Sequence, residues 1–340
     1  MNKDSDSPKM KIGLALGSGS ARGLAHIGVI KALTEEGIHI DYMAGTSIGA
    51  LIGAVYVGGG LDRLEEFMHT VDWKMIASYC DFVFPRVGLL QGGKINRFID
   101  RFLPAKTFEE TNIPLTVVAT DLITGEEVLF KKGDLVQAVR ASISLPGIFQ
   151  PVKYNGTYLV DGGLVNPVPA NIVKAMGADF VLAVDLSLDV ATRNVGKRKL
   201  KTLRRKNKTK PVKRRRRTLK EEQSTWVFKK LEEKYRSVET SVKKTINNWK
   251  DDTPPVEEPE EPNIFDVMAS SLNIMGYHIT QRNLEFYKPD ILLQPEISYI
   301  GLFDYDEAKS IIDEGYQQTK ERIDNILMAI ENNGKEIISE

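Results

Sequence analysis

The chain has 340 residues, of which 42% are hydrophobic and 27% are charged, a composition typical of a water-soluble globular protein. No apolar run is long enough to span a bilayer, and the polar start of the sequence lacks the apolar core of a secretory signal. The single cysteine, Cys80, excludes an internal disulfide and cysteine-based metal clusters and favours a reducing compartment, so we expect a cytoplasmic protein.

The charge is distributed very unevenly along the chain. Lys and Arg balance Asp and Glu at 46 each, but 16 of the basic residues and none of the acidic ones fall in 191–220. The remainder therefore holds 30 basic and 46 acidic residues, a net charge of −16. A strongly basic segment within an acidic chain indicates an insertion with a role of its own.

The first predicted elements are a strand, a loop of small residues and a helix. Alternating residues predict the strand over 11–16, and the helix follows over 24–36. The loop between them, 17–23, reads GSGSARG. Backbone N–H groups of such a loop converge on an anion, either a nucleotide phosphate or the oxyanion of an acyl-transfer intermediate. The dinucleotide fingerprint G-x-G-x-x-G is not met, because Arg22 occupies its sixth position. A glycine-rich turn without a ligand is the third interpretation.

The next feature is the pentapeptide Gly45-Thr46-Ser47-Ile48-Gly49, which precedes an apolar helix predicted over 50–57. A sharp strand-to-helix turn strains the backbone at Ser47 and leaves room only for very small neighbours, which explains Gly45 and Gly49. The turn holds the serine hydroxyl clear of the backbone, beside helix N–H groups that stabilise negative charge. Ser47 is therefore a candidate nucleophile, and a purely structural turn is the alternative.

Strands and helices continue to alternate as far as residue 187. Helices are predicted over 61–76, 94–103, 135–142 and 167–176, strands over 114–122, 127–130, 158–161 and 178–187, and irregular segments over 81–93 and 144–151. The strand at 158–161 ends in Asp161-Gly162-Gly163. This alternation predicts an α/β protein whose mainly parallel sheet is covered by helices on both faces.

Four motifs occur together and in a fixed order. They are the 17–23 loop with its Arg22-Gly23, the pentapeptide around Ser47, the segment ASISLPGIFQPV at 141–152, and Asp161-Gly162-Gly163. In this combination residues 10–187 resemble the patatin-like phospholipase family, specifically its short bacterial members. The resemblance implies a three-layer α/β/α patatin-like fold and a lipid acyl hydrolase with a Ser–Asp dyad, in which Ser47 is the nucleophile and Asp161 the proton acceptor.

The resemblance also assigns the first loop. Ser18, Gly19 and Ser20 take the places of the family's three-glycine oxyanion loop, and Arg22 and Gly23 follow. Two of those glycines are serines here. Oxyanion donors are backbone N–H groups, so a serine can still donate where its dihedral angles are allowed.

The reaction itself requires a base that takes the serine proton. Of the four histidines, we interpret His26, His39 and His69 as structural or solvated. Only His278, in an amphipathic helix, follows Asp161 as a Ser-acid-His order requires. We favour a direct Ser47–Asp161 contact, with burial raising the pKa of the carboxyl, an acyl-enzyme intermediate, and no metal or cofactor. A Ser47–acid–His278 esterase and an inactive lipid- or partner-binding module are the alternatives.

The predicted organisation has four parts. They are a polar tail (1–10), a patatin-like catalytic core (11–188), a charged insertion (189–262), and a C-terminal part (263–340) that completes the core with helices over 263–286 and 304–332 and a strand over 288–296. The insertion holds the basic run (191–220), a charged helical pattern (218–249) and an acidic proline-rich stretch (251–262).

The basic run at 191–220 has three possible roles. One is peripheral contact with an anionic inner-membrane surface, and another is a solvated tether. The third is nucleic-acid binding, which the lack of interleaved aromatic residues disfavours. The expected partner is a lipid or fatty-acyl ester; the sequence does not predict head group, chain length or oligomeric state.

Overall fold

The computed structural model describes residues 10–72, 75, 92–187 and 264–338. Contacts divide the chain into one unit of Met1–Lys197 with Asp266–Glu340 and a second of Arg198–Phe265. The second unit falls almost wholly outside the described residues. So do Cys80, the basic run, and residues 81–91 of the irregular segment predicted over 81–93. The four-part organisation stays a prediction, and the fold below is that of the first unit.

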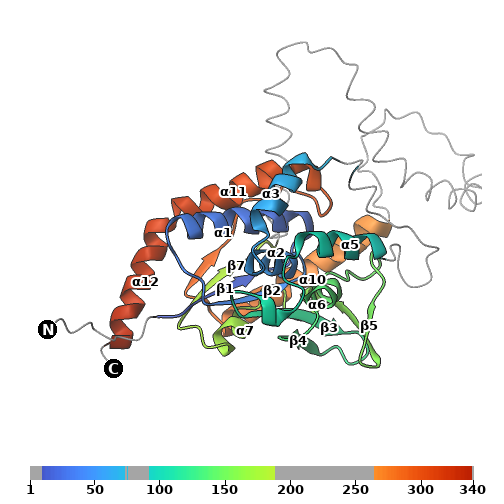
Figure 1. Ribbon diagram of the computed structural model, residues 1–340, viewed down its shortest axis with the longest axis horizontal. Coiled ribbons are helices and arrows are strands. Elements are labelled where there is room, and N and C mark those ends of the chain that lie inside the picture. Colours follow the sequence, from blue (N-terminus) through green and yellow to red (C-terminus); the bar gives the residue numbers. More distant parts are fainter. Residues whose placement is uncertain (1–9, 73–74, 76–91, 188–263, 339–340) are drawn as a thin grey trace, which may run out of the picture. The chain divides into compact units, whose positions relative to one another are not determined.

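An eight-stranded sheet forms the centre of this unit (Figure 1). Its order is β5-β6-β3-β2-β1-β7-β8, with β4 paired to β3. Strand bounds are β1 Ile12–Leu16, β2 Tyr42–Thr46, β3 Leu115–Asp121, β4 Glu127–Phe130, β5 Val152–Tyr154, β6 Thr157–Asp161, β7 Phe180–Val184 and β8 Ile291–Leu293. Strands β8, β7, β1, β2 and β3 run parallel, and β4, β6 and β5 add antiparallel pairs at one edge.

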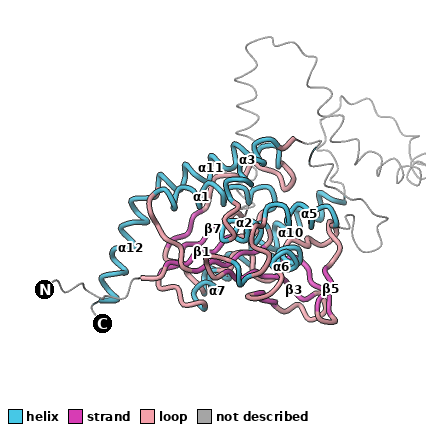
Figure 2. Tube along the Cα trace, in the orientation of Figure 1, coloured by secondary structure: helices cyan, strands magenta, loops and turns pink. Residues whose placement is uncertain are grey.

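Helices cover both faces of the sheet (Figures 1 and 2). Their bounds are α1 Ala25–Glu35, α2 Ile48–Val57, α3 Leu61–Thr70, α5 Gly93–Phe102, α6 Leu135–Ser142, α7 Ala170–Ala175, α10 Ile264–Phe286, α11 Ala308–Glu321 and α12 Ile323–Ile338. Short 3-10 turns occur at Ser20–Leu24, Phe108–Glu110, Gly162–Leu164 and Tyr305–Glu307. The predicted three-layer α/β/α fold is confirmed, with a mixed sheet whose central strands are parallel.

The two faces of the sheet are packed differently. Because side chains alternate along a strand, Leu14 and Leu16 of β1 enter the larger core with α1 and α2, while Ala15 enters the smaller core with Val173 of α7. A Cβ on Gly13 would lie 2.0 Å from Val173 Cγ1, so only small residues on β1 let α7 approach this closely. The face of the sheet that carries the larger core is called the large face; it also holds α2, the buried helix that follows Ser47.

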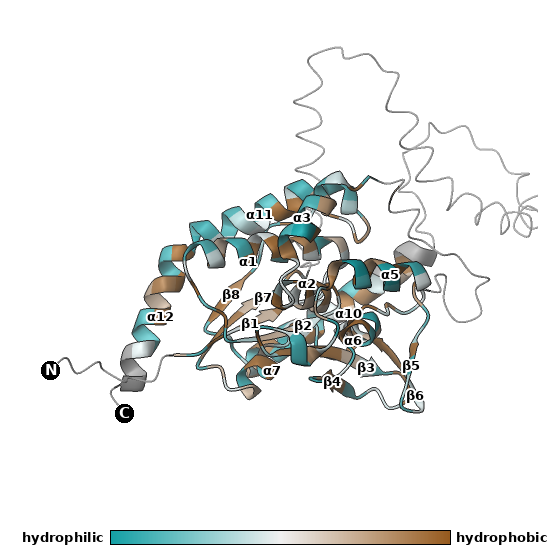
Figure 3. Cartoon of the chain, in the orientation of Figure 1, coloured by the Kyte–Doolittle hydropathy of each residue, from teal (hydrophilic) through white to brown (hydrophobic). Residues whose placement is uncertain are grey.

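The helices on the large face are amphipathic or fully apolar, according to how deeply they lie. Helix α2 is buried along almost its whole length, as an all-apolar helix must be. Hydrophilic and hydrophobic residues alternate along α11, which covers α1 (Figure 3). In the part of the chain that the structure describes, no helix combines the length and apolarity needed to cross a membrane.

Two expected helices differ from those observed, and one observed hairpin has no counterpart among the expected elements. The single helix predicted over 304–332 is wrong, because helical bonding stops at Arg322, whose guanidinium donates to the Leu292 carbonyl of β8 at 2.6 Å. The helix predicted from Pro167 starts only at Ala170, since its N-cap is Pro169. The hairpin β5–β6 was not expected; both residues of its turn, Asn155 and Gly156, have positive φ angles of 45° and 88°.

Candidate active site

Ser47 occupies the turn between β2 and α2, with φ 57° and ψ −122°. This conformation with a positive φ is unusual for a serine and persists only where the surroundings enforce it. A Cβ on Gly45 would lie 2.5 Å from the Gly49 carbonyl oxygen, and one on Gly49 would lie 2.2 Å from that of Leu16. Both glycines are therefore required by close backbone contacts, and the strained strand–serine–helix turn has the predicted form.

Asp161 lies at the end of β6 with its carboxyl against the serine. The Ser47 hydroxyl donates to Oδ2 of Asp161 at 2.5 Å, and the backbone N–H of Gly163 donates to Oδ1 at 2.8 Å. Burial raises the pKa of Asp161 to about 6, against the two hydrogen bonds, which lower it. A Cβ on Gly162 would lie 2.3 Å from the Val118 carbonyl oxygen, so the first glycine of this motif permits the close turn.

The loop that opens with Gly17 lies beside this pair, and its members differ in what they can donate. The N–H of Ser18 already donates to the Pro167 carbonyl at 2.8 Å. The N–H groups of Gly19 and Ser20 have no acceptor among the described residues. Ser20 has φ 53°, and its hydroxyl donates to the Leu302 carbonyl at 2.6 Å. The amides of Gly19 and Ser20 are thus the pair in this loop left to receive an anion.

Arg22 and Gly23 support the loop from its far end. The guanidinium of Arg22, which is 2% exposed, donates to the Gly19 carbonyl at 3.3 Å and to Asn273 Oδ1 of α10 at 2.9 Å. A Cβ on Gly23 would lie 2.1 Å from Cγ2 of Ile48. Gly23 therefore lets the loop pack directly against the first residue of α2, and Arg22 orients the peptide that carries the Ser20 N–H.

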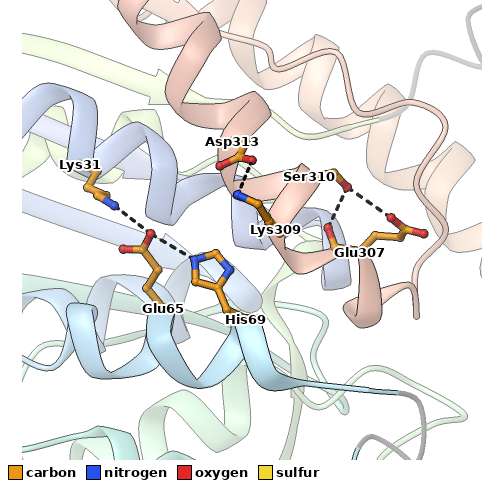
Figure 4. Close-up of polar contacts among 7 residues, drawn as sticks. All are labelled: Lys31, Glu65, His69, Glu307, Lys309, Ser310 and Asp313. Atoms are coloured by element: carbon orange, nitrogen blue, oxygen red, sulfur yellow. Dashed lines mark hydrogen bonds and ion pairs between the residues drawn. The ribbon is translucent and has the colours of Figure 1, made fainter.

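The four histidines lie away from the Ser47–Asp161 pair. His26 is fully buried beneath the loop, 2.7 Å from the Gly17 carbonyl oxygen, and burial lowers its pKa to about 4. His39 is exposed beside Asp41. His69 of α3 lies 3.5 Å from Glu65, which also pairs with Lys31 of α1 (Figure 4).

His278 is the histidine that the triad alternative requires. It is exposed on α10, next to the ring of Tyr277. It is not among the described residues that line the cavity around Ser47. This position gives the Ser47–acid–His278 arrangement no support.

The pair opens into a cavity of about 280 Å³. Most of its described lining is apolar and comes from α2, α3, α5, α10 and the loop after α6: among others Leu51, Leu64, Phe67, Phe98, Phe149 and Leu272. The polar atoms of Ser47 and Asp161 lie in this apolar wall. Such a cavity suits an apolar chain whose polar end lies at the pair. Among the described residues, no three His, Cys, Asp or Glu side chains are grouped so as to hold a metal ion.

Sequence reasoning missed the residues that hold the pair in place. Ser142, the last residue of α6, accepts a hydrogen bond from the Ser47 N–H at 2.8 Å. The Ser144 carbonyl accepts one from the Asp161 N–H at 3.0 Å, and the Thr46 hydroxyl donates to the Asn166 carbonyl at 2.8 Å. Ser142 and Ser144 both lie in the motif at 141–152, which is the one signal for them in the sequence.

Fold and site together define an α/β protein with a serine at a strained strand-to-helix turn and an aspartate bonded to it in an apolar cavity. Residues 14–174 match the family model described as patatin-like phospholipase. Residues 14–174 therefore form a domain of the patatin-like phospholipase family, and the resemblance inferred from the motifs is confirmed.

Curated relatives agree with this assignment. An uncharacterized NTE family protein of Mycobacterium tuberculosis is 40% identical over 185 residues, which cover 54% of this chain and 51% of that protein. Patatin-like phospholipase domain-containing protein 6 of Mus musculus is 37% identical over 182 residues, which cover 52% of this chain and 13% of that protein. The chain thus matches about half the length of the mycobacterial relative. The crystal structure of VipD from Legionella pneumophila aligns with 96% of this chain and 80% of its own, at a TM-score of 0.33 and 16% identity, too distant to support an inference.

Proposed function

We propose that the protein is a serine acyl-ester hydrolase that acts on lipid-like esters through a Ser47–Asp161 dyad. The observation that carries the proposal is the 2.5 Å hydrogen bond from the Ser47 hydroxyl to Asp161 Oδ2, at the wall of an apolar cavity. Membership of a family described as patatin-like phospholipase favours the same chemistry.

In the proposed acylation step, Asp161 takes the hydroxyl proton as the Ser47 oxygen attacks the ester carbonyl carbon. The carbonyl oxygen becomes an oxyanion and accepts hydrogen bonds from the Gly19 and Ser20 N–H groups. When the intermediate collapses, the bond to the leaving alcohol breaks, Asp161 returns the proton to that alcohol, and an acyl-serine remains.

Deacylation repeats these transfers with water as the nucleophile. Asp161 takes a proton from water, the hydroxide attacks the acyl-serine carbonyl, and the proton returns to Ser47 as the carboxylic acid leaves. A carboxylate with an ordinary pKa is a weak base at neutral pH, but burial raises the pKa of Asp161 to about 6. This places the base close to its working pH while leaving it mostly ionised at pH 7.

Hydrolysis of a short p-nitrophenyl ester tests the proposal and its two alternatives. Ser47→Ala and Asp161→Asn should each lose about 10²-fold or more in kcat, while His278→Ala should match the parent. Loss of activity in His278→Ala as well would support the triad. A parent no faster than Ser47→Ala would indicate a binding module instead.

We further propose that the basic run at 191–220 brings the enzyme to an anionic membrane surface. Its 16 Lys and Arg residues lie outside the described part of the structure, and near such a surface each contributes about 1 kcal/mol. Sedimentation with vesicles of phosphatidylcholine and phosphatidylglycerol should fall when Lys213 to Arg217 are replaced by glutamine, and with added salt. Unchanged sedimentation would reject this role. The cytoplasmic location stays a prediction.

A further inference from the structure

Ser142 has no part in the reaction, yet it contacts the nucleophile's backbone. It ends α6 and is completely buried. Its hydroxyl donates to the Val118 carbonyl of β3 at 2.6 Å and accepts from the Ser47 N–H at 2.8 Å. A serine hydroxyl has one proton, so donation to Val118 fixes its orientation and leaves an oxygen lone pair aimed at Ser47.

The Ser47 N–H needs such an acceptor because of the turn itself. At φ 57°, the carbonyl of Ser47 accepts from the Leu51 N–H in the first turn of α2, but its N–H bonds neither in the β2 ladder nor in that helix. A backbone N–H without a partner inside a protein is costly. The hydroxyl of Ser142 thus satisfies the one backbone donor that the strained conformation leaves unpaired. It also ties that donor to the central strand β3.

The same short segment holds the other member of the pair. Two residues beyond Ser142, the Ser144 carbonyl accepts the Asp161 N–H at 3.0 Å. The Thr120 hydroxyl of β3 donates to the Asp161 carbonyl at 2.9 Å. Ser47 and Asp161 are therefore both fixed, through their backbones, to the end of α6 and to β3.

We propose that Ser142 is a positioning residue that sets the distance between the Ser47 hydroxyl and the Asp161 carboxylate. This inference rests on the proposed dyad function. Without the Ser142 hydroxyl, the Ser47 backbone loses its tie to β3 and its hydroxyl moves away from the hydrogen-bonded position. A displacement on the order of 1 Å at a reacting atom can cost about 10²-fold in rate.

The pH profile separates positioning from a merely structural role. The hydrogen bond from Ser47 is one of the two contacts that lower the pKa of Asp161 against burial. If Ser142 maintains that bond, its removal lets the pKa of Asp161 rise, and the acidic limb of kcat/KM moves to higher pH. If the substitution only destabilises the fold, the molecules that remain folded keep the parent's pKa for Asp161, and the acidic limb of kcat/KM does not move.

A suitable control is Thr319→Val. Thr319 is 1% exposed on α11, and its hydroxyl donates to the Gly315 carbonyl at 2.8 Å, so the change also removes one buried, hydrogen-bonded hydroxyl, but on a helix that lies outside the site. Rates on a p-nitrophenyl ester are expressed per site titrated with a fluorophosphonate, which corrects for misfolded protein. Ser142→Ala should lose about 10- to 100-fold in kcat with little change in KM. The acidic limb of its kcat/KM profile should move to higher pH. Thr319→Val should keep the parent's kcat and limb.

Ser142→Cys is a second variant in case Ser142→Ala does not fold, since a thiol keeps the volume of the side chain but forms weaker hydrogen bonds. It should change kcat and the acidic limb in the same direction as Ser142→Ala, but to a smaller extent. Equal kcat and equal limbs for the parent, the Ser142 variants and Thr319→Val would overturn the positioning role alone. A parent no more active than Ser47→Ala would overturn the proposed function, and this inference with it.

Discussion

The Ser47 hydroxyl and the Asp161 carboxylate are hydrogen-bonded at 2.5 Å, although 114 positions separate them in the chain. The sheet explains how they meet. Strand β3 lies between β2 and β6, and Thr46 is level with Val118 while Asp161 is level with Ala119. Strands β2 and β6 therefore end beside adjacent residues of β3, one on each side of it.

The first prediction concerns the pH dependence of activity. As the proposed base, Asp161 must be ionised, and burial raises its pKa to about 6. We expect kcat/KM to be full above this pH and to fall about tenfold per pH unit below it. Stopped or continuous assays between pH 4.5 and 8 measure this limb; a rate that stays constant down to pH 4.5 would contradict the assignment of Asp161.

The second prediction concerns what the buried carboxyl does to stability. Burial raises its pKa from the ordinary value of 3.8, which applies to the unfolded chain, to about 6 in the folded state, so the folded state binds this proton more tightly. The resulting stabilisation is complete below pH 3.8 and is lost as the pH rises through 6, where the ionised group costs about 3 kcal/mol. Asp161→Asn should therefore gain stability over the parent at pH 8 and much less at pH 4. A gain of equal size at both pH values in urea unfolding would refute this.

The third prediction concerns His26, whose effect has the opposite sign. Burial lowers its pKa from 6.5 to about 4, so the unfolded state binds the proton more tightly. The stability that this neutral imidazole contributes is present above pH 6.5 and is lost as the pH falls toward 4, by up to about 3 kcal/mol. His26→Gln does not titrate, so the parent's advantage over it should grow between pH 4.5 and 7.5. An advantage independent of pH would show that the pKa of His26 is the same in the folded and unfolded states, which would contradict the lowered value.

The fourth prediction tests the close packing of the turn. In Gly49→Ala, the new Cβ would lie 2.2 Å from the Leu16 carbonyl oxygen, and backbone atoms cannot yield as a side chain does. We expect a loss of about 2 kcal/mol or more. Gly334→Ala in α12 is the matched control, because its Cβ would meet nothing within 4 Å; it should stabilise by roughly 0.5–1 kcal/mol. Equal thermal stabilities for the two variants would contradict the packing argument.

The sequence was sufficient for features that depend on neighbouring residues. The turn at Ser47 needs its glycines within two positions, and Asp161 closes its own strand, so both are visible locally. The Asn155-Gly156 pair is an equally local signal for a two-residue hairpin, and β5 could have been predicted from it.

Other features depend on contacts between distant segments. Ser142 reads as an ordinary helix residue, and its partners, the Ser47 N–H and the Val118 carbonyl, belong to two other elements. The break between α11 and α12 has no glycine or proline, and Arg322 is instead held by a carbonyl of β8. That the Ser18 N–H is already taken by Pro167 is likewise visible only once the chain is folded.

The most direct test of the central claim is the reaction with a fluorophosphonate, followed by intact mass and peptide mapping. The dyad predicts a single adduct on Ser47, no adduct in Ser47→Ala, a labelling rate reduced about 10²-fold or more in Asp161→Asn, and an unchanged rate in His278→Ala. An adduct on another residue, or equal labelling rates for the parent and Asp161→Asn, would contradict it.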